Sequence, residues 1–147
     1  MRTIALRFGE NIAPECGTIE AHNQLIGQYG EVWYGKFGTP LSEKVITDIL
    51  KNESPRILLI HSGTANRYWA YINKISKETP DLKKVPKYYH HEKGRVKTWF
   101  CVYRFENAEK DIMSKCKVAS SGALLSNASR HSMSPYFIID VSAERKE

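Results

Sequence analysis

Residues 57–75 read ILLIHSGTANRYWAYINKI. The first four form a continuous apolar run, which is typical of a central strand buried on both faces of a sheet. A turn-rich loop over residues 61–66 follows, and residues 67–75 then have the aromatic and β-branched composition of a second strand. We expect the two strands to pair as a hairpin.

Patterns on either side of this hairpin predict the other elements. Alternation over Arg2–Phe8 indicates a half-buried strand, and a helix begins with Thr18 as its N-cap and closes at Gly30. A second helix opens near Leu41, with Ser42 as its N-cap. The remaining expected elements are strands over residues 98–105, 117–119 and 136–141 and a short helix over residues 107–115. Residues 77–94, with two prolines and scattered lysines, resemble an irregular insertion.

The order of these elements decides the fold class. Strands outnumber helices and follow one another in hairpins, which favours a mixed or largely antiparallel sheet. The 147 residues, 41% of them hydrophobic, suffice for one core. We therefore predict a single α+β domain over residues 1–147, with a small curved, mostly antiparallel sheet or open barrel flanked by two or three helices.

Charge and composition restrict the partners. Lys and Arg number 22 against 16 Asp and Glu, a net charge of +6, and such a surplus attracts polyanions such as nucleic acid. No apolar stretch approaches the ~20 residues of a membrane span, and the first residues do not resemble a signal peptide. We expect a cytoplasmic protein that has no membrane partner.

Motifs for catalysis are incomplete. Gly30 and Lys36 have the spacing of a phosphate-binding loop, but Phe37 stands where Ser or Thr must hold magnesium. The histidines and the cysteines Cys16, Cys101 and Cys116 form no zinc motif, and no serine nucleophile elbow occurs. We predict no catalytic residue, no metal site and no cofactor. We interpret the adjacent histidines His90 and His91 as part of a solvent-exposed, lysine-rich loop.

Two other features point to a ligand. His61 ends a buried strand and opens a loop of small residues, where ligands often approach, although it could equally hydrogen-bond its neighbours. Aromatic residues also gather at three places, and aromatic faces stack on bases with ~1–3 kcal/mol per base. Each tryptophan could instead be an ordinary core residue. Basic residues that would contact phosphates accompany them: Lys36, Arg67, Lys97 and Arg104.

Several of these segments resemble one superfamily. The aromatic-glycine segment Val32–Lys36 and the apolar strand that ends in His61-Ser62 resemble the PUA-like superfamily and, within it, the EVE and YTH domains. The segments Val118–Ser126 and Ser132–Ser134 are similar to the specificity domains of modification-dependent restriction systems of the McrBC kind. The resemblance implies a pocket for a modified base, such as a methylated adenine or cytosine, flipped from DNA or presented by RNA.

We therefore predict a module that recognises a modified base, with a methylated base favoured, by flipping it into an aromatic pocket; modified DNA is the favoured partner and RNA is the alternative. Trp33 and Trp99 are expected to face each other across a cleft closed by His61-Ser62 and by a Ser120-Ser121 loop. The predicted base-binding residues are Trp33, Tyr34, Gly35, Lys36, His61, Ser62, Tyr68, Trp99, Ser120 and Ser121. A fused or associated motor or nuclease subunit would be a further partner.

Two alternatives stay open. One is a small enzyme of the related ASCH kind, a ribonuclease or amidohydrolase, that uses a lysine or histidine near His61. An acid or lysine within hydrogen-bond reach of His61 would favour it. The other is a protein-interaction domain whose aromatic surface meets a partner chain.

Overall fold

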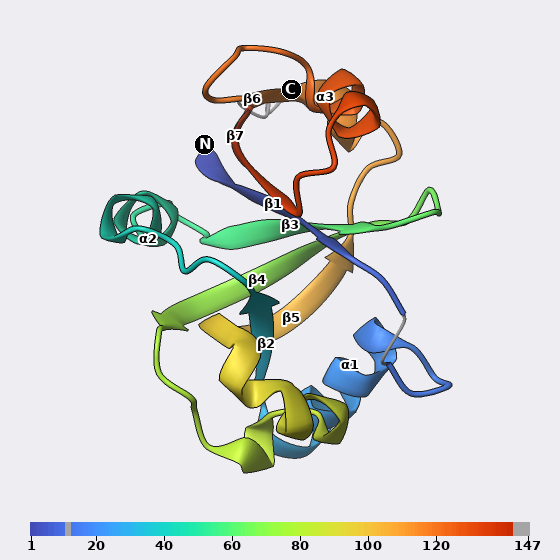
Figure 1. The fold of residues 1–147 in the computed structure, drawn as a ribbon, viewed down its shortest axis with the longest axis vertical. Helices are drawn as coiled ribbons and strands as arrows, with labels where there is room; N and C mark the ends of the chain where they lie inside the picture. Colours follow the sequence, from blue (N-terminus) through green and yellow to red (C-terminus); the bar gives the residue numbers. More distant parts are fainter. Residues whose placement is uncertain (11–12, 143–147) are drawn as a thin grey trace.

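A computed structural model describes residues 1–10 and 13–142. Within these residues the chain forms seven strands, three α-helices and three 3-10 helices (Figure 1). In chain order they are β1 (Arg2–Phe8), α1 (Thr18–Tyr29), β2 (Val32–Phe37), α2 (Glu43–Leu50), β3 (Arg56–His61), β4 (Arg67–Ser76), η1 (Leu82–Lys84), η2 (Lys87–Arg95), β5 (Val96–Asn107), η3 (Ile112–Lys115), β6 (Cys116–Val118), α3 (Leu125–His131) and β7 (Tyr136–Val141).

The strands make one mixed sheet in the order β2-β5-β4-β3-β1-β7-β6. Only β1 and β3 run parallel, with Phe8 opposite His61, and every other pair is antiparallel. The sheet is not closed into a barrel. The predicted α+β class with a mostly antiparallel, open sheet is therefore confirmed, as is the β3–β4 hairpin.

Both faces of the sheet are covered. On one face Leu6, Leu59 and Phe100 pack with apolar residues of α1 and α2. On the other face Leu58 and Ile60 pack with apolar residues of η3, α3 and β7. Alternate residues of β3 therefore enter two different cores, which explains why residues 57–60 are all apolar.

The helix ends show one difference from the expected pattern. Gly30 closes α1 in the left-handed conformation, and the hydroxyl of Ser42 accepts a hydrogen bond from the Val45 N–H, as predicted. Thr18, however, is the first residue of α1 rather than its N-cap. The Glu10 carboxylate, two residues after β1, fills that role, because it accepts bonds from the N–H and the hydroxyl of Thr18 at 3.0 and 2.7 Å.

Two further expectations were wrong. The helix predicted over residues 107–115 is limited to the 3-10 turn η3, and α3 was not predicted. Residues 77–94 are not an irregular insertion: they form η1 and much of η2, and their Val85 and Tyr89 are buried against Val96 and Trp99. No helix in the described part of the chain combines the length and apolarity needed to cross a membrane.

Candidate nucleic-acid interface

A cavity of about 200 Å³ lies between the end of β1 and strand β2. Pockets for drug-sized ligands measure ~300–1,000 Å³, so this one suits a single ring system. Its lining comes from β1, α1, β2, η2 and the residue before β7: Leu6, Arg7, Phe8, Gly9, Thr18, Tyr34, Gly35, Lys36, Phe37, Tyr88, Tyr89 and Pro135.

Aromatic rings form much of the wall of this cavity. Tyr88 and Tyr89 of η2 stack at 4.6 Å between ring centroids, and Phe37 of β2 lies 5.8 Å from Tyr89. Tyr34 is buried, with the ring of His22 stacked at a tilt of 36° on it. The cavity therefore offers ring faces and edges to a planar ligand.

Lys36 brings a positive charge to this wall. Its side chain is only 2% exposed, its ammonium donates to the Thr39 carbonyl oxygen at 2.6 Å, and burial lowers its pKa. No carboxylate of residues 1–10 and 13–142 pairs with it. Its burial leaves the ammonium poorly placed for a phosphate on the outer surface, but suited to an electron-rich group in the cavity.

Gly35 is required here by packing. A Cβ at this position would lie 2.8 Å from Cγ1 of Val96 and 3.2 Å from Cζ3 of Trp99. The missing side chain thus lets β5 side chains lie directly against β2. The hydroxyl of Tyr89 donates to the Gly35 carbonyl oxygen at 3.5 Å, which ties η2 to the same strand.

His22 is a buried residue next to this wall that the sequence pattern did not single out. Its Nδ1 lies 2.7 Å from the carbonyl oxygen of Thr18, an acceptor, so Nδ1 carries the proton. Burial lowers the pKa of His22 to about 4, which keeps the ring neutral near pH 7. Its Nε2 is then an acceptor, and it has no hydrogen-bond partner among the described residues.

The expected pair of tryptophans across a cleft is wrong. In the register of β2 and β5, Trp33 is opposite Cys101 and Gly35 is opposite Trp99, so both indoles lie on the same face of the sheet. Trp99 is fully buried and meets Tyr89 edge-on at 6.0 Å, whereas Trp33 is half-buried. Neither lines the cavity.

His61 and its neighbours lie behind the cavity. The His61 ring stacks on Phe8 at 4.7 Å and its Nε2 is 3.2 Å from Glu10, while Tyr68 lies 6.3 Å from Phe8. Ser62 is exposed and donates its N–H to the Phe8 carbonyl oxygen. These residues support the wall through Phe8 but are not part of the lining.

The other predicted contacts are dispersed. Ser120 and Ser121 lie in an exposed turn after β6, so they do not close this cavity. Arg67 donates to carbonyls of its own loop, and Lys97 is exposed. Arg104 lies 4.0 Å from the Tyr71 ring centroid, on a different part of the sheet.

Of the lining residues, the sequence analysis predicted only Tyr34, Gly35 and Lys36, and it missed among others Arg7, Thr18, Tyr88 and Tyr89. Arg7 donates to the carbonyl oxygens of Ser129, Ser132 and Ser134 and so fixes the segment before β7 beside the cavity. The adjacent tyrosines were a usable signal, but the prolines and lysines around them favoured a loop.

In the described residues no group of three or more His, Cys, Asp or Glu side chains could hold a metal ion.

The model of the Pua-like family matches residues 4–142. The chain belongs to the Pua-like family. No match was found among curated proteins or among solved structures. Pua-like domains generally bind nucleic acids and are usually binding modules rather than enzymes, which agrees with the positive net charge of this one.

Proposed function

We propose that this Pua-like domain is a nucleic-acid reader that accepts one extruded, modified base in the cavity between β1 and β2. One observation carries the proposal: aromatic side chains and a buried ammonium surround a space for a single ring system. The resemblance of Val32–Lys36 and His61-Ser62 to EVE and YTH domains supports a methylated base. The likeness to McrBC-type specificity domains supports DNA and a motor or nuclease partner.

The lining has the chemistry that such a base requires. A planar ring gains stacking or edge contacts from Tyr34 and Tyr88, and a methyl group adds apolar contact without a new hydrogen bond. The Lys36 ammonium can donate to a carbonyl oxygen or ring nitrogen on the base edge. Extrusion from a duplex costs a few kcal/mol, so single-stranded or weakly paired targets should bind better.

Residues outside the cavity would serve the same complex. Arg67, Lys97 and Arg104 are the proposed phosphate contacts, since the exposed or half-exposed side chains of these residues can reach a backbone. His61 and Tyr68 would keep Phe8 in place beside the base. The proposed place of action is the cytoplasm.

A binding screen tests the proposal. Single-stranded and duplex oligonucleotides of DNA and RNA, with and without methylated adenine or cytosine, would be titrated by fluorescence anisotropy. Tyr88→Ala should weaken binding of the preferred modified strand by ~1–3 kcal/mol. Tyr103→Ala, which removes a 41% exposed tyrosine outside the cavity, should change little. Equal affinity for every modified and unmodified strand would exclude the proposal.

One observation favours the hydrolase alternative. Glu10 lies within hydrogen-bond reach of His61, at 3.2 Å, as an acid–base pair would require. The other Glu10 oxygen already accepts two bonds from Thr18, and the His61 ring is stacked on Phe8. Incubating the protein and a His61→Asn variant with RNA and amide substrates, with products followed by mass spectrometry, tests this function. Turnover that disappears in His61→Asn would establish it.

A further inference from the structure

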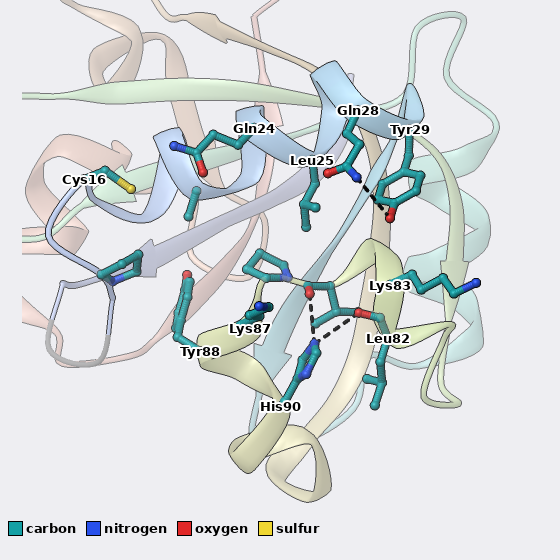
Figure 2. Close-up of a pocket in the computed structure, with 14 residues that line it drawn as sticks. Cys16, Gln24, Leu25, Gln28, Tyr29, Leu82, Lys83, Lys87, Tyr88 and His90 are labelled. Carbon is teal, nitrogen blue, oxygen red and sulfur yellow. Dashed lines mark hydrogen bonds between the residues drawn. The ribbon is translucent and has the colours of Figure 1, made fainter.

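A second, larger hollow lies on the α1 side of the molecule. Helix α1 forms one wall and residues 82–90 form the other, and together they enclose a groove of about 960 Å³ (Figure 2). We propose that this groove holds the single-stranded nucleotides next to the extruded base. The inference rests on the proposed function. It adds a path for the nucleotides that flank the extruded base, which the cavity between β1 and β2 (here called the base cavity) does not by itself provide.

The groove adjoins the cavity proposed for the base. Tyr88 is part of the lining of both. In Figure 2 Tyr88 stands at one end of the groove, near Cys16, while Tyr29 and Lys83 stand at the other. A strand whose base enters the cavity would therefore pass Tyr88 and continue along α1 towards Tyr29.

The charge of the groove fits a polyanion. Lys83 and Lys87 are exposed in its lining, and no Asp or Glu is part of that lining. Neither side-chain ammonium has a hydrogen-bond or ion-pair partner in the described chain. The amides of Gln24 and Gln28 also line it and can bond to bases or sugars.

The groove also offers a stacking surface that is already exposed. Tyr29 is 39% exposed at the end of α1, and the Gln28 amide donates to its hydroxyl at 3.3 Å. Sequence-tolerant binding of single strands combines such aromatic rings with cations along the backbone. Tyr29 and the two lysines supply both parts.

His90 keeps the opposite wall in shape. Its Nε2 lies 3.1 Å from the carbonyl oxygen of Leu82 and 3.0 Å from that of Val85, so this nitrogen carries a proton and is shared between them. The bonds join η1 to η2 without a ligand. A groove formed in advance spares the ordering cost of binding.

The length of the groove sets the number of nucleotides. Ala21 and Tyr29 both line it, and the eight helical steps from one to the other span roughly 12 Å. At ~3.4 Å per stacked nucleotide this distance holds about three nucleotides. The strand should therefore be bound on one side of the extruded base, over about three positions.

Oligonucleotides that differ in the number of nucleotides flanking the modified base test the proposed path of the strand. Single strands would carry the preferred modified base with about one, three or five nucleotides on the 5′ side, on the 3′ side or on both. We expect affinity to increase with length on one side only and to level off near three nucleotides. An equal gain on both sides, or none on either, would overturn the proposed path.

Variants of the groove provide a second test. Lys83→Ala combined with Lys87→Ala should weaken binding of modified and unmodified strands alike and reduce the slope of log affinity against log salt by about 1.4, at ~0.7 per contact for single strands. Tyr29→Ala should cost about 5- to 150-fold on long strands but nothing on the shortest. Lys117→Ala, an exposed lysine on β6, is the matched control.

The two proposals fail in different ways. Loss of the preference for the modified base, with the flank and lysine effects intact, contradicts the base cavity and leaves the groove. A preserved preference, with the Lys83 and Lys87 variants behaving as Lys117→Ala does, contradicts the groove. That second outcome is also the one expected if the groove binds a peptide.

Discussion

The ammonium of Lys36 on β2 lies 4.3 Å from the ring centroid of Tyr136, the first residue of β7. Four strands separate β2 from β7 in the sheet order. The contact forms because the sheet curves until its edge strand approaches the start of β7. The cavity that we propose for the base lies at this junction, between Lys36 on one side and Pro135 on the other.

Replacing Lys36 should change selectivity rather than salt dependence. Because the ammonium is buried, Lys36→Met should reduce the preference for the modified base and leave the slope of log affinity against log salt unchanged. Lys97→Met, at an exposed site, should instead lower that slope by ~0.7–0.9 and keep the preference. Titrations at several salt concentrations measure both. A salt slope that falls equally in the two variants would refute this assignment.

Gly35→Ala should destabilise the fold. The new methyl group would lie 2.8 Å from a Val96 methyl carbon and close to the buried Trp99, so the Val96 side chain or one of strands β2 and β5 must shift. We expect a loss of ~1–3 kcal/mol in the free energy of unfolding, the usual cost of overpacking. Urea unfolding measures it, and Gly94→Ala, where a Cβ meets nothing within 4 Å, serves as the control. Equal stability of the two variants would contradict the packing argument.

The two tryptophans should behave differently. Trp99→Ala removes a fully buried indole and should lower the free energy of unfolding by ~3–5 kcal/mol. Trp33 is half-buried, so Trp33→Ala should cost clearly less. Chemical denaturation of both variants checks the difference. Equal losses would mean that the indole of Trp33 is as important to the core as that of Trp99.

His22 should make stability depend on pH. Its folded-state pKa of about 4 lies below the unfolded value of 6.5, so the unfolded chain binds the proton first as pH falls. The contribution is fully present above pH 6.5 and is lost between 6.5 and about 4. At pH ~5 it amounts to a loss of about 2 kcal/mol relative to pH ~7.5.

Urea unfolding at the two pH values, for the protein and for His22→Phe, isolates this effect. The non-titrating variant should lack that part of the pH dependence, because phenylalanine takes up no proton. Identical pH profiles for the two proteins would show that His22 does not titrate as its burial requires.

Local sequence patterns identified most of the fold. The apolar run at residues 57–60, the alternation over Arg2–Phe8 and the hydroxyl of Ser42 each act within a few residues, so they could be recognised directly. The cap of α1 could not be recognised in this way, because Glu10 lies eight residues before Thr18 in the sequence and contacts it only after the chain has turned. The 3-10 segments at residues 82–95 were missed because their core contacts are made with β5, which no local pattern reveals.

The candidate site was predicted in part. Tyr34, Gly35 and Lys36 line the cavity because the aromatic-glycine segment is itself one wall. Tyr88 and Arg7 were not recognised, since their positions depend on how η2 and β7 fold back on the sheet. The pairing of Trp33 with Trp99 was wrong because strand register, which places both on one face, cannot be derived from aromatic content.

The position of β1 has a consequence for how the protein is made. Its neighbours are β3 and β7, and the Arg2–Asp140 ion pair joins residues 138 positions apart. During synthesis at ~5–20 residues per second, β1 waits on the order of ten seconds for its second partner. Until then Ile4 and Leu6 lie on a strand with an open edge, a surface on which nascent chains associate with chaperones or with one another. A ribosome-bound chain that ends before β7 should therefore be protease-sensitive at β1, and one that includes β7 should be protected.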